Sequence, residues 1–268
     1  MDLASYFKRI HYTANPSPNL DTLRALHLLH PSHIPFENID VLLDYGIDLG
    51  PSAVEQKIIT QRRGGYCFEH NGLFMRVLKQ IGFEVEPMIA RVQWNVPEDA
   101  PPSPRTHMVL KVRIQDQWYL TDVGYGGNVL TTPLLLESNE PQSTHHEVFR
   151  VLPIQQGFRL EAQIENQWLP VCDVSHERQL PIDFEVANWY TSKHPQSKFR
   201  HNLMAARATE NTRYTLLNNR LTIRTKGKPA IKQRLQTEEL KLALAEHFKL
   251  PVTEQWHPLL EKLCHQNP

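Results

Sequence analysis

Cysteine is scarce in this chain and follows no motif spacing. The 268 residues include three cysteines, Cys67, Cys172 and Cys264. An odd, scattered set argues against a disulfide framework and against a cysteine-rich zinc site. The segment His145-His146-Glu147 lacks the H-E-x-x-H spacing of a zinc enzyme. We therefore expect no metal site, and a reducing compartment such as the cytoplasm.

Long apolar runs and an excess of charge of one sign are also missing. No apolar stretch approaches the roughly 18 residues that cross a membrane. Met1 to Ile10 carries the mixed charges of an amphipathic helix rather than the pattern of a signal peptide. Lys plus Arg and Asp plus Glu both total 29, so the formal net charge is zero. Without a basic block we expect neither a nucleic-acid partner nor a membrane, and we look for small-molecule partners.

The order of the apolar patterns predicts an α+β protein. Residues 1 to about 83 have helical periodicity, with a second helix that runs from near Leu20 to before Pro31. Residues 84 to about 180 alternate in polarity and predict a mostly antiparallel sheet or barrel. The last third mixes helical and strand patterns. A chain of this length can bury a core deep enough to hold a cleft.

The stretch from Arg62 to Asn71, RRGGYCFEHN, places a cysteine where a helix begins. Two glycines before Cys67 allow a sharp turn, and the pattern behind it predicts a helix that stops at Gly82. The apolar stripe of this helix comprises Leu73, Phe74, Val77, Leu78 and Ile81. Free N–H groups and the positive end of the helix dipole favour a thiolate at such a position. Cys67 is therefore the candidate nucleophile.

Two further residues are candidates to assist it. His107 opens a predicted strand and Asp122 closes the next one, 15 residues later. If the turn centres on residues 114–115, the two side chains are direct cross-strand neighbours. If it centres on residues 116–117, they lie several residues out of register and a bulge is needed. A cysteine at a helix start, with a histidine and an acid on adjacent strands, is the arrangement of papain-like thiol enzymes. Cys67 would be the nucleophile, His107 the base and Asp122 the orienting acid.

Four motifs together resemble the arylamine N-acetyltransferases, whose bacterial members have a similar length. They are Ile34-Pro35-Phe36-Glu37-Asn38; Arg63-Gly64-Gly65-Tyr66-Cys67-Phe68-Glu69 with Asn71; His107-Met108-Val109-Leu110; and Asp122-Val123-Gly124-Tyr125-Gly126-Gly127. The resemblance extends from Tyr6 to Leu136. It implies an N-terminal helical bundle over residues 1–83, a central antiparallel β-barrel over 84–190 and a C-terminal α/β lid over 191–268. A papain-like Cys-His-Asp core would join them.

The same resemblance implies an acyltransferase with a ping-pong reaction. Acetyl-CoA would be the co-substrate, and no cofactor would stay bound. Cys67 would take the acetyl group as a thioester, His107 would activate the thiol, and Asp122 would orient His107. The acceptor would be an arylamine, an arylhydrazine or an N-hydroxyarylamine, which is the chemistry of xenobiotic metabolism.

The resemblance also implies a substrate pocket beside the triad. The loop after Asp122 would form a wall of the acyl and CoA pocket, with Gly126 and Gly127 in that wall. Tyr125 and Phe36 are candidates for contact with an aromatic substrate.

Glu37 and Arg63 flank the two best-matched motifs. We hypothesise a buried ion pair between them that fixes the glycine turn. Removing one partner would leave an uncompensated buried charge, which costs roughly 3–5 kcal/mol.

Other functions use the same three side chains. A papain-like or transglutaminase-like hydrolase would share the triad, and an amide synthase of the same fold would take its acyl group from a carrier protein. A non-catalytic binding module is disfavoured because Cys67, His107 and Asp122 are all present. The helical first third and the glycine loop after Asp122 favour the transferase.

Overall fold

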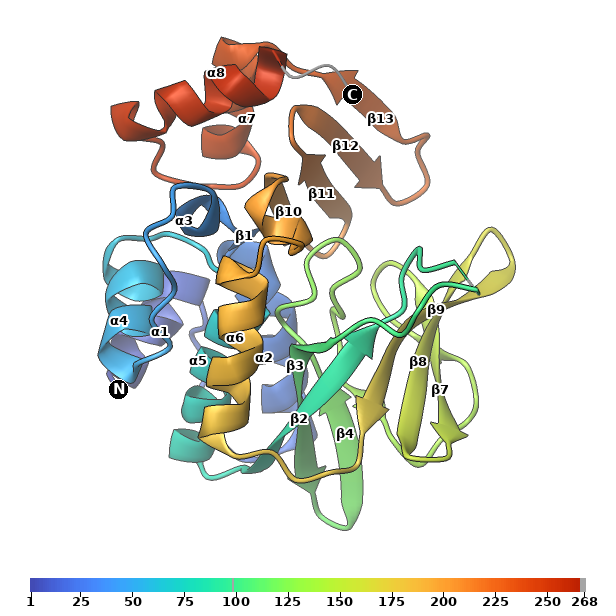
Figure 1. Cartoon of the computed structure of the whole chain (residues 1–268). Helices are drawn as coiled ribbons and strands as arrows, with labels where there is room; N and C mark the ends of the chain where they lie inside the picture. Colours follow the sequence, from blue (N-terminus) through green and yellow to red (C-terminus); the bar gives the residue numbers. More distant parts are fainter. Residues whose placement is uncertain (98, 266–268) are drawn as a thin grey trace.

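Helices make up the first unit. In the computed structural model, which describes residues 1–97 and 99–265, they are α1 (Leu3–Ile10), α2 (Leu20–His33), α3 (Ile39–Leu42), α4 (Pro51–Glu55) and α5 (Cys67–Ile81). The Asp2 side chain caps α1, and Gly82, with a φ of 107°, ends α5. Buried Leu23, Leu26 and Phe74 belong to a core that α2 and α5 share. Figure 1 shows this unit at one side of the molecule.

Helix α2 passes through Pro31, so the prediction that this helix ends before the proline is wrong. Pro31 lies in the last turn, where its missing N–H removes little of the helical bonding. The Ile34 N–H donates to the His30 carbonyl oxygen at 2.8 Å, and the Ser32 hydroxyl donates to the Leu28 carbonyl oxygen at 2.7 Å. These bonds close the turn around the proline.

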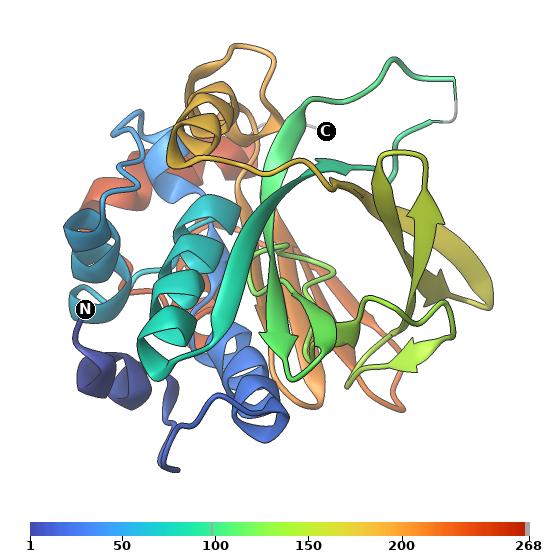
Figure 2. The same ribbon diagram turned by 90° about the horizontal axis from the view of Figure 1, so that it is seen from below.

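Eight antiparallel strands form the second unit, a nearly closed barrel (Figure 2). They are β2 (Glu84–Val92), β3 (Arg105–Ile114), β4 (Gln117–Thr121), β5 (Leu134–Leu135), β6 (Gln142–Ser143), β7 (Val148–Ile154), β8 (Gly157–Ile164) and β9 (Gln167–Ser175). Their order in the sheet is β5-β4-β3-β2-β9-β8-β7-β6. Alternate side chains such as Met88, Leu120 and Phe149 fill the interior.

A five-stranded sheet and two helices form the third unit. Its elements are β10 (Met204–Ala208), β11 (Thr212–Leu217), β12 (Arg220–Thr225), β13 (Ile231–Arg234), α7 (Thr237–Glu246) and α8 (His257–His265). The fifth strand, β1 (Phe36–Glu37), comes from the first unit and pairs with β10. Phe36 also bridges to Gly65, so the edge of this sheet reaches the loop before Cys67.

Helix α6 (Pro181–Lys193) connects the barrel to the third unit and packs beside β3 (Figure 1). It continues past residue 190, where the end of the barrel unit was expected. The predicted α+β class, with helices first, an antiparallel barrel second and an α/β unit last, is confirmed. None of the helices in residues 1–97 and 99–265 is both long and apolar enough to cross a membrane.

Candidate active site

The β3–β4 hairpin brings His107 and Asp122 together. Its turn consists of residues 115–116, because Ile114 pairs with Gln117. This register lies between the two that the sequence left open. It sets His107 and Asp122 two residues out of direct opposition and without a bulge, so they are diagonal neighbours on one face of the hairpin. The His107 Nε2 atom lies 2.6 Å from Asp122 Oδ2.

Cys67 is the first residue of α5 and lies at the positive end of the helix dipole. Its sulfur is 3.7 Å from the Thr106 carbonyl oxygen, next to His107 along β3. Cys67 is 5% exposed and His107 is 4% exposed, so little of either group meets solvent. The loop after the hairpin presses on this helix start, since a Cβ on Gly124 would lie 2.8 Å from the Cys67 Cα. Glycine is required there by close approach.

Burial and mutual attraction set the charges of the triad. Burial would lower the pKa of His107, but the Asp122 carboxylate and the Cys67 sulfur outweigh it and raise that pKa to about 10. Burial would raise the pKa of Asp122, but His107 and Asn71 outweigh it and lower that pKa. An imidazolium and a carboxylate are therefore present at neutral pH. Because Asp122 occupies Nε2, the His107 Nδ1 atom is the one left to serve the thiol, and a cation there suits a thiolate nucleophile.

Asn71 is part of the cysteine motif, but the sequence patterns predicted no role for it in the site. Its Nδ2 atom donates to the Met108 carbonyl oxygen at 2.7 Å and to Asp122 Oδ1 at 2.9 Å. Its Oδ1 atom accepts the Val123 N–H at 3.1 Å. Asn71 therefore bonds α5 to both chain segments at the open end of the hairpin. The available signal was its spacing of four residues after Cys67, which puts both side chains on one face of the helix.

The predicted pocket residues lie in two places near the triad. Phe36 lies against Gly126, where a Cβ would be 3.4 Å from the phenylalanine ring. The Tyr125 ring stands edge-on to the His107 imidazole at 5.0 Å between centroids, and its hydroxyl donates to the Val171 carbonyl oxygen at 2.9 Å. Tyr125 is thus anchored in the barrel and packs on the His107 ring. Whether either ring contacts substrate stays a prediction.

The fourth pocket residue, Gly127, is held by a buried arginine of the third unit. Arg213 on β11 is 1% exposed and donates to the Gly127 carbonyl oxygen at 2.8 Å and to the Val129 carbonyl oxygen at 3.2 Å. The Glu147 carboxylate neutralises its charge, with Oε2 2.6 Å from Arg213 Nη2. The loop after Asp122 is therefore bonded to the third unit, which is part of the framework of the site.

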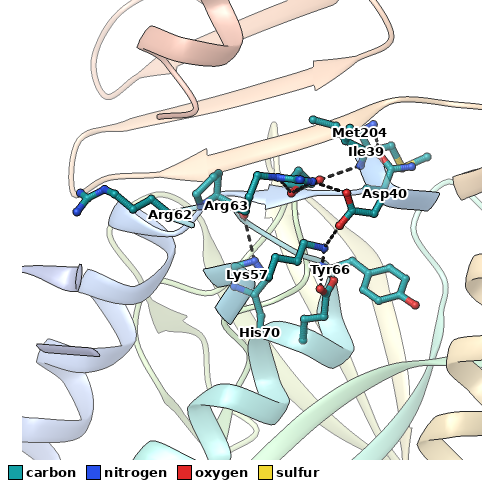
Figure 3. Close-up of polar contacts among 12 residues, drawn as sticks. Ile39, Asp40, Lys57, Arg62, Arg63, Tyr66, His70 and Met204 are labelled. Atoms are coloured by element: carbon teal, nitrogen blue, oxygen red, sulfur yellow. Dashed lines mark hydrogen bonds and ion pairs between the residues drawn. The ribbon is translucent and has the colours of Figure 1, made fainter. Parts of the chain in front are cut away.

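Glu37 and Arg63 belong to a larger group of buried charges, which we call the ionic cluster. Its members are Glu37, Asp40, Lys57, Arg63 and Glu69. The Arg63 Nη2 atom lies 2.8 Å from both Glu37 Oε1 and Asp40 Oδ1. The Lys57 Nζ atom lies 2.8 Å from Asp40 Oδ2 and 2.7 Å from Glu69 Oε1. Figure 3 shows Arg63 and Lys57 both reaching the Asp40 carboxylate, each joined to it by a dashed line.

The ionic cluster holds the loop that precedes Cys67. Glu69 Oε2 accepts the Tyr66 N–H at 3.0 Å, and Tyr66 is the residue before Cys67. Gly64 is needed in this loop for close approach, since a Cβ there would collide with the Pro35 carbonyl oxygen. The motif that contains Cys67 and the motif of residues 34–38 therefore meet through backbone contact as well as through charge.

The other two cysteines lie outside this site. Cys172 is buried in the barrel, where burial raises the pKa of its thiol, and the Cys264 sulfur lies 3.5 Å from the Leu235 carbonyl oxygen. Within the part of the chain that the structure describes, no three His, Cys, Asp or Glu side chains are grouped to hold a metal ion.

Known proteins are similar to this chain in sequence. The family model described as N-acetyltransferase matches residues 19–257. An arylamine N-acetyltransferase of Mycobacterium tuberculosis is 39% identical over 265 residues, which cover 95% of this chain and 91% of the relative. A Salmonella typhimurium relative, named arylamine N-acetyltransferase / N-hydroxyarylamine O-acetyltransferase, is 40% identical over 205 residues, 76% of this chain and 72% of its own.

A solved structure shares the fold as well. The Mycobacterium marinum arylamine N-acetyltransferase in complex with CoA superposes with a TM-score of 0.92 at 36% identity, over 98% of each chain. The resemblance carried by the four motifs is therefore confirmed. The chain belongs to the arylamine N-acetyltransferase family, with its papain-like fold, and is an acyltransferase.

Proposed function

We propose that this chain transfers an acetyl group from acetyl-CoA to an arylamine, an arylhydrazine or an N-hydroxyarylamine through a thioester on Cys67. The observation that carries the proposal is the 2.6 Å contact between His107 and Asp122 beside a cysteine at a helix start. This geometry offers a nucleophile, a base and an orienting acid in one buried place. CoA in the M. marinum complex and the acceptors in the relatives' names support the choice of substrates.

The first half-reaction would load the enzyme. The Cys67 thiolate attacks the carbonyl carbon of acetyl-CoA, and the bond between that carbon and the CoA sulfur breaks. The His107 imidazolium gives its proton to the departing CoA thiolate. The Cys67 N–H at the start of α5 is the expected donor to the oxyanion. One thioester replaces another, so the step costs little free energy.

The second half-reaction would release the product. The acceptor nitrogen, or the oxygen of a hydroxylamine, attacks the acetyl carbon, and the bond to the Cys67 sulfur breaks. The proton of the acceptor passes to His107, which Asp122 holds in orientation throughout. Two substrates that use one site in turn produce ping-pong kinetics. Phe36 and Tyr125 are the proposed contacts of the aromatic ring, because Tyr125 packs on His107 and Phe36 lies against Gly126 in the loop after Asp122.

Mass spectrometry of the protein incubated with acetyl-CoA alone tests the first half-reaction. We expect one acetyl group on the peptide that contains Cys67, and its loss when an arylamine is added. Cys67→Ser should abolish the adduct, whereas Cys264→Ser, which removes a cysteine outside the site, should keep it. Asp122→Asn should slow loading by about 10²-fold or more and leave CoA binding largely intact.

Absence of the adduct, with no release of CoA when an arylamine is present, would overturn the proposal. Release of CoA without an acetylated amine would indicate a thioester hydrolase. Loading from an acyl carrier protein but not from acetyl-CoA would indicate an amide synthase.

A further inference from the structure

His27 is a buried histidine that the proposed reaction does not use. It lies on α2 and is fully buried, and its Nε2 atom is 3.1 Å from the backbone nitrogen of Asp122. The Asp122 N–H therefore donates a hydrogen bond to the imidazole. The same ring stands edge-on to Phe74 of α5, at 6.0 Å between centroids.

The Asp122 N–H needs this acceptor because Asp122 lies beyond the sheet. Strand β4 ends at Thr121, whose pairing with Leu110 is the outermost of the β3–β4 ladder. A buried N–H without an acceptor is strongly unfavourable, so such a residue shifts unless a partner is supplied. His27 supplies it from a different part of the fold.

The carboxylate of Asp122 is held separately from its backbone. Asn71 Nδ2 and the Gly124 N–H both donate to Oδ1 at 2.9 Å, while His107 bonds to Oδ2. These bonds fix the rotation of the Asp122 carboxylate about its side chain. The bond from the Asp122 N–H to His27 fixes the backbone of Asp122 relative to α2. The position of the backbone and the rotation of the carboxylate together determine where Oδ2 lies relative to His107.

We propose that His27 is a positioning residue that sets the place of Asp122 and, through it, the orientation of His107. The Nδ1 atom of His27 is buried and has no hydrogen-bond partner among the described residues. The bond to Asp122 therefore orients the ring, and the Nδ1 atom is left without a hydrogen bond. The inference rests on the role proposed above for the triad in activating Cys67, and not on either substrate.

The hydrogen bond also determines the protonation state of His27. An acceptor at Nε2 requires a lone pair there, so the proton lies on Nδ1 and the ring is neutral. Burial lowers the pKa of His27 to about 3, which agrees with a neutral ring. The titratable groups that face it are Asp122, His145 and His30.

Alkylation of Cys67 by iodoacetamide tests the proposal without acetyl-CoA or an amine. The rate is measured against pH by mass spectrometry for the wild type, His27→Leu and His27→Gln. Leucine fills the space without an acceptor, whereas the glutamine amide oxygen can accept the Asp122 N–H. We expect His27→Leu to lower the rate at neutral pH about tenfold, and to move the pH of half-maximal rate upward by about one unit. For His27→Gln, the rate and the pH of half-maximal rate should both lie closer to the wild-type values than those of His27→Leu do.

A matched control lies on the same helix. His33 is half-buried on α2 and packs on His11, 4.6 Å between ring centroids, so His33→Gln should leave the alkylation profile unchanged. A His27→Leu profile equal to that of the wild type, or a His27→Gln variant as impaired as His27→Leu, would overturn the proposal.

The wild-type protein provides a second test that does not depend on how the variants fold. Nuclear magnetic resonance of the assigned His27 ring at pH 7 should show a proton on Nδ1 and none on Nε2. A proton on Nε2 would overturn the proposal. If no acetyl adduct forms on Cys67 while the His27 effect on alkylation is present, acetyl transfer is overturned and the positioning role stands.

Discussion

Two buried polar groups hold the start of α5, and they are built on opposite principles. In the ionic cluster, three carboxylates surround two cations. The other group, which we call the histidine chain, consists of Tyr6, His30 and His70. The Tyr6 hydroxyl donates to His30 Nδ1 at 2.9 Å, and His30 Nε2 donates to His70 Nδ1 at 2.9 Å. The His70 Nε2–H donates to the Pro35 carbonyl oxygen at 3.1 Å, and since a carbonyl only accepts, this last bond sets the direction of the others.

Burial acts differently on the two groups. For Lys57, burial would lower the pKa, but Glu69, Glu37 and Asp40 outweigh it and raise that pKa. In the histidine chain burial dominates: it lowers the pKa of His70 to about 4 and holds that of His30 well below 6.5. The ionic cluster thus depends on keeping the charges of its two cations and of Asp40, although burial raises the pKa of Glu69, and the histidine chain depends on having no charge. Changes of pH and single substitutions can separate the two.

The largest expected effect is acid destabilisation through the histidine chain. Both rings bind a proton near pH 6.5 in the unfolded chain, but they stay neutral to lower pH in the folded protein. The unfolded state therefore binds more protons, so stability is full above pH 6.5 and is lost as the pH falls toward about 4. His70 alone removes about 1.4 kcal/mol per pH unit between pH 6.5 and about 4, and His30 adds a loss of the same sign.

Urea unfolding between pH 4.5 and 7.5 measures this loss. His70→Gln removes one titrating ring, so the slope of the unfolding free energy against pH should fall by about one proton. Asp40 stays charged over this window because Lys57 and Arg63 outweigh burial and hold its pKa below 3.8. Arg62→Met, which replaces an exposed arginine next to the cluster, should leave the slope as it is. A His70→Gln variant with the wild-type slope would contradict the account of the histidine chain.

The next largest effect comes from breaking the ionic cluster. Arg63→Met leaves Glu37, which is 1% exposed, without its cation, so we expect a loss of about 3–5 kcal/mol in the free energy of unfolding. Arg62→Met is the matched control, because the adjacent Arg62 side chain is exposed. Adding Glu37→Gln to Arg63→Met should recover part of the loss. An Arg63→Met variant as stable as Arg62→Met would show that the cluster contributes little.

The parts of the site that could be predicted from the sequence are those set by local patterns. The helix start at Cys67 follows from an apolar periodicity that begins behind two glycines, and the strands of His107 and Asp122 follow from alternation on both sides of a short turn. The register of that hairpin could not be predicted, because adjacent dipeptides were equally able to form the turn and each choice changes the pairing.

The parts that escaped prediction depend on contacts between distant segments. His27 meets Asp122 across 95 residues, and Asn71 meets it across 51. Neither bond produces a periodic pattern in the sequence, because each forms only when the helices and the hairpin are packed together. The same is true of β1, a two-residue strand that pairs with β10 far along the chain and is too short to show alternation.

The smallest expected effect isolates one bond of the histidine chain. Tyr6→Phe keeps a fully buried ring but leaves His30 Nδ1 without its donor, so we expect a loss of about 1–2 kcal/mol near pH 7. Tyr45→Phe, at a side chain that is 64% exposed, should change nothing. The bond in which Tyr6 donates forms only with the neutral His30 ring, so its removal should raise the pKa of that ring in the folded protein, and the loss should shrink once the pH falls below that raised pKa. A Tyr6→Phe loss that grows with acid would mean that His30 carries a charge when folded, and the distinction between the two groups would fail.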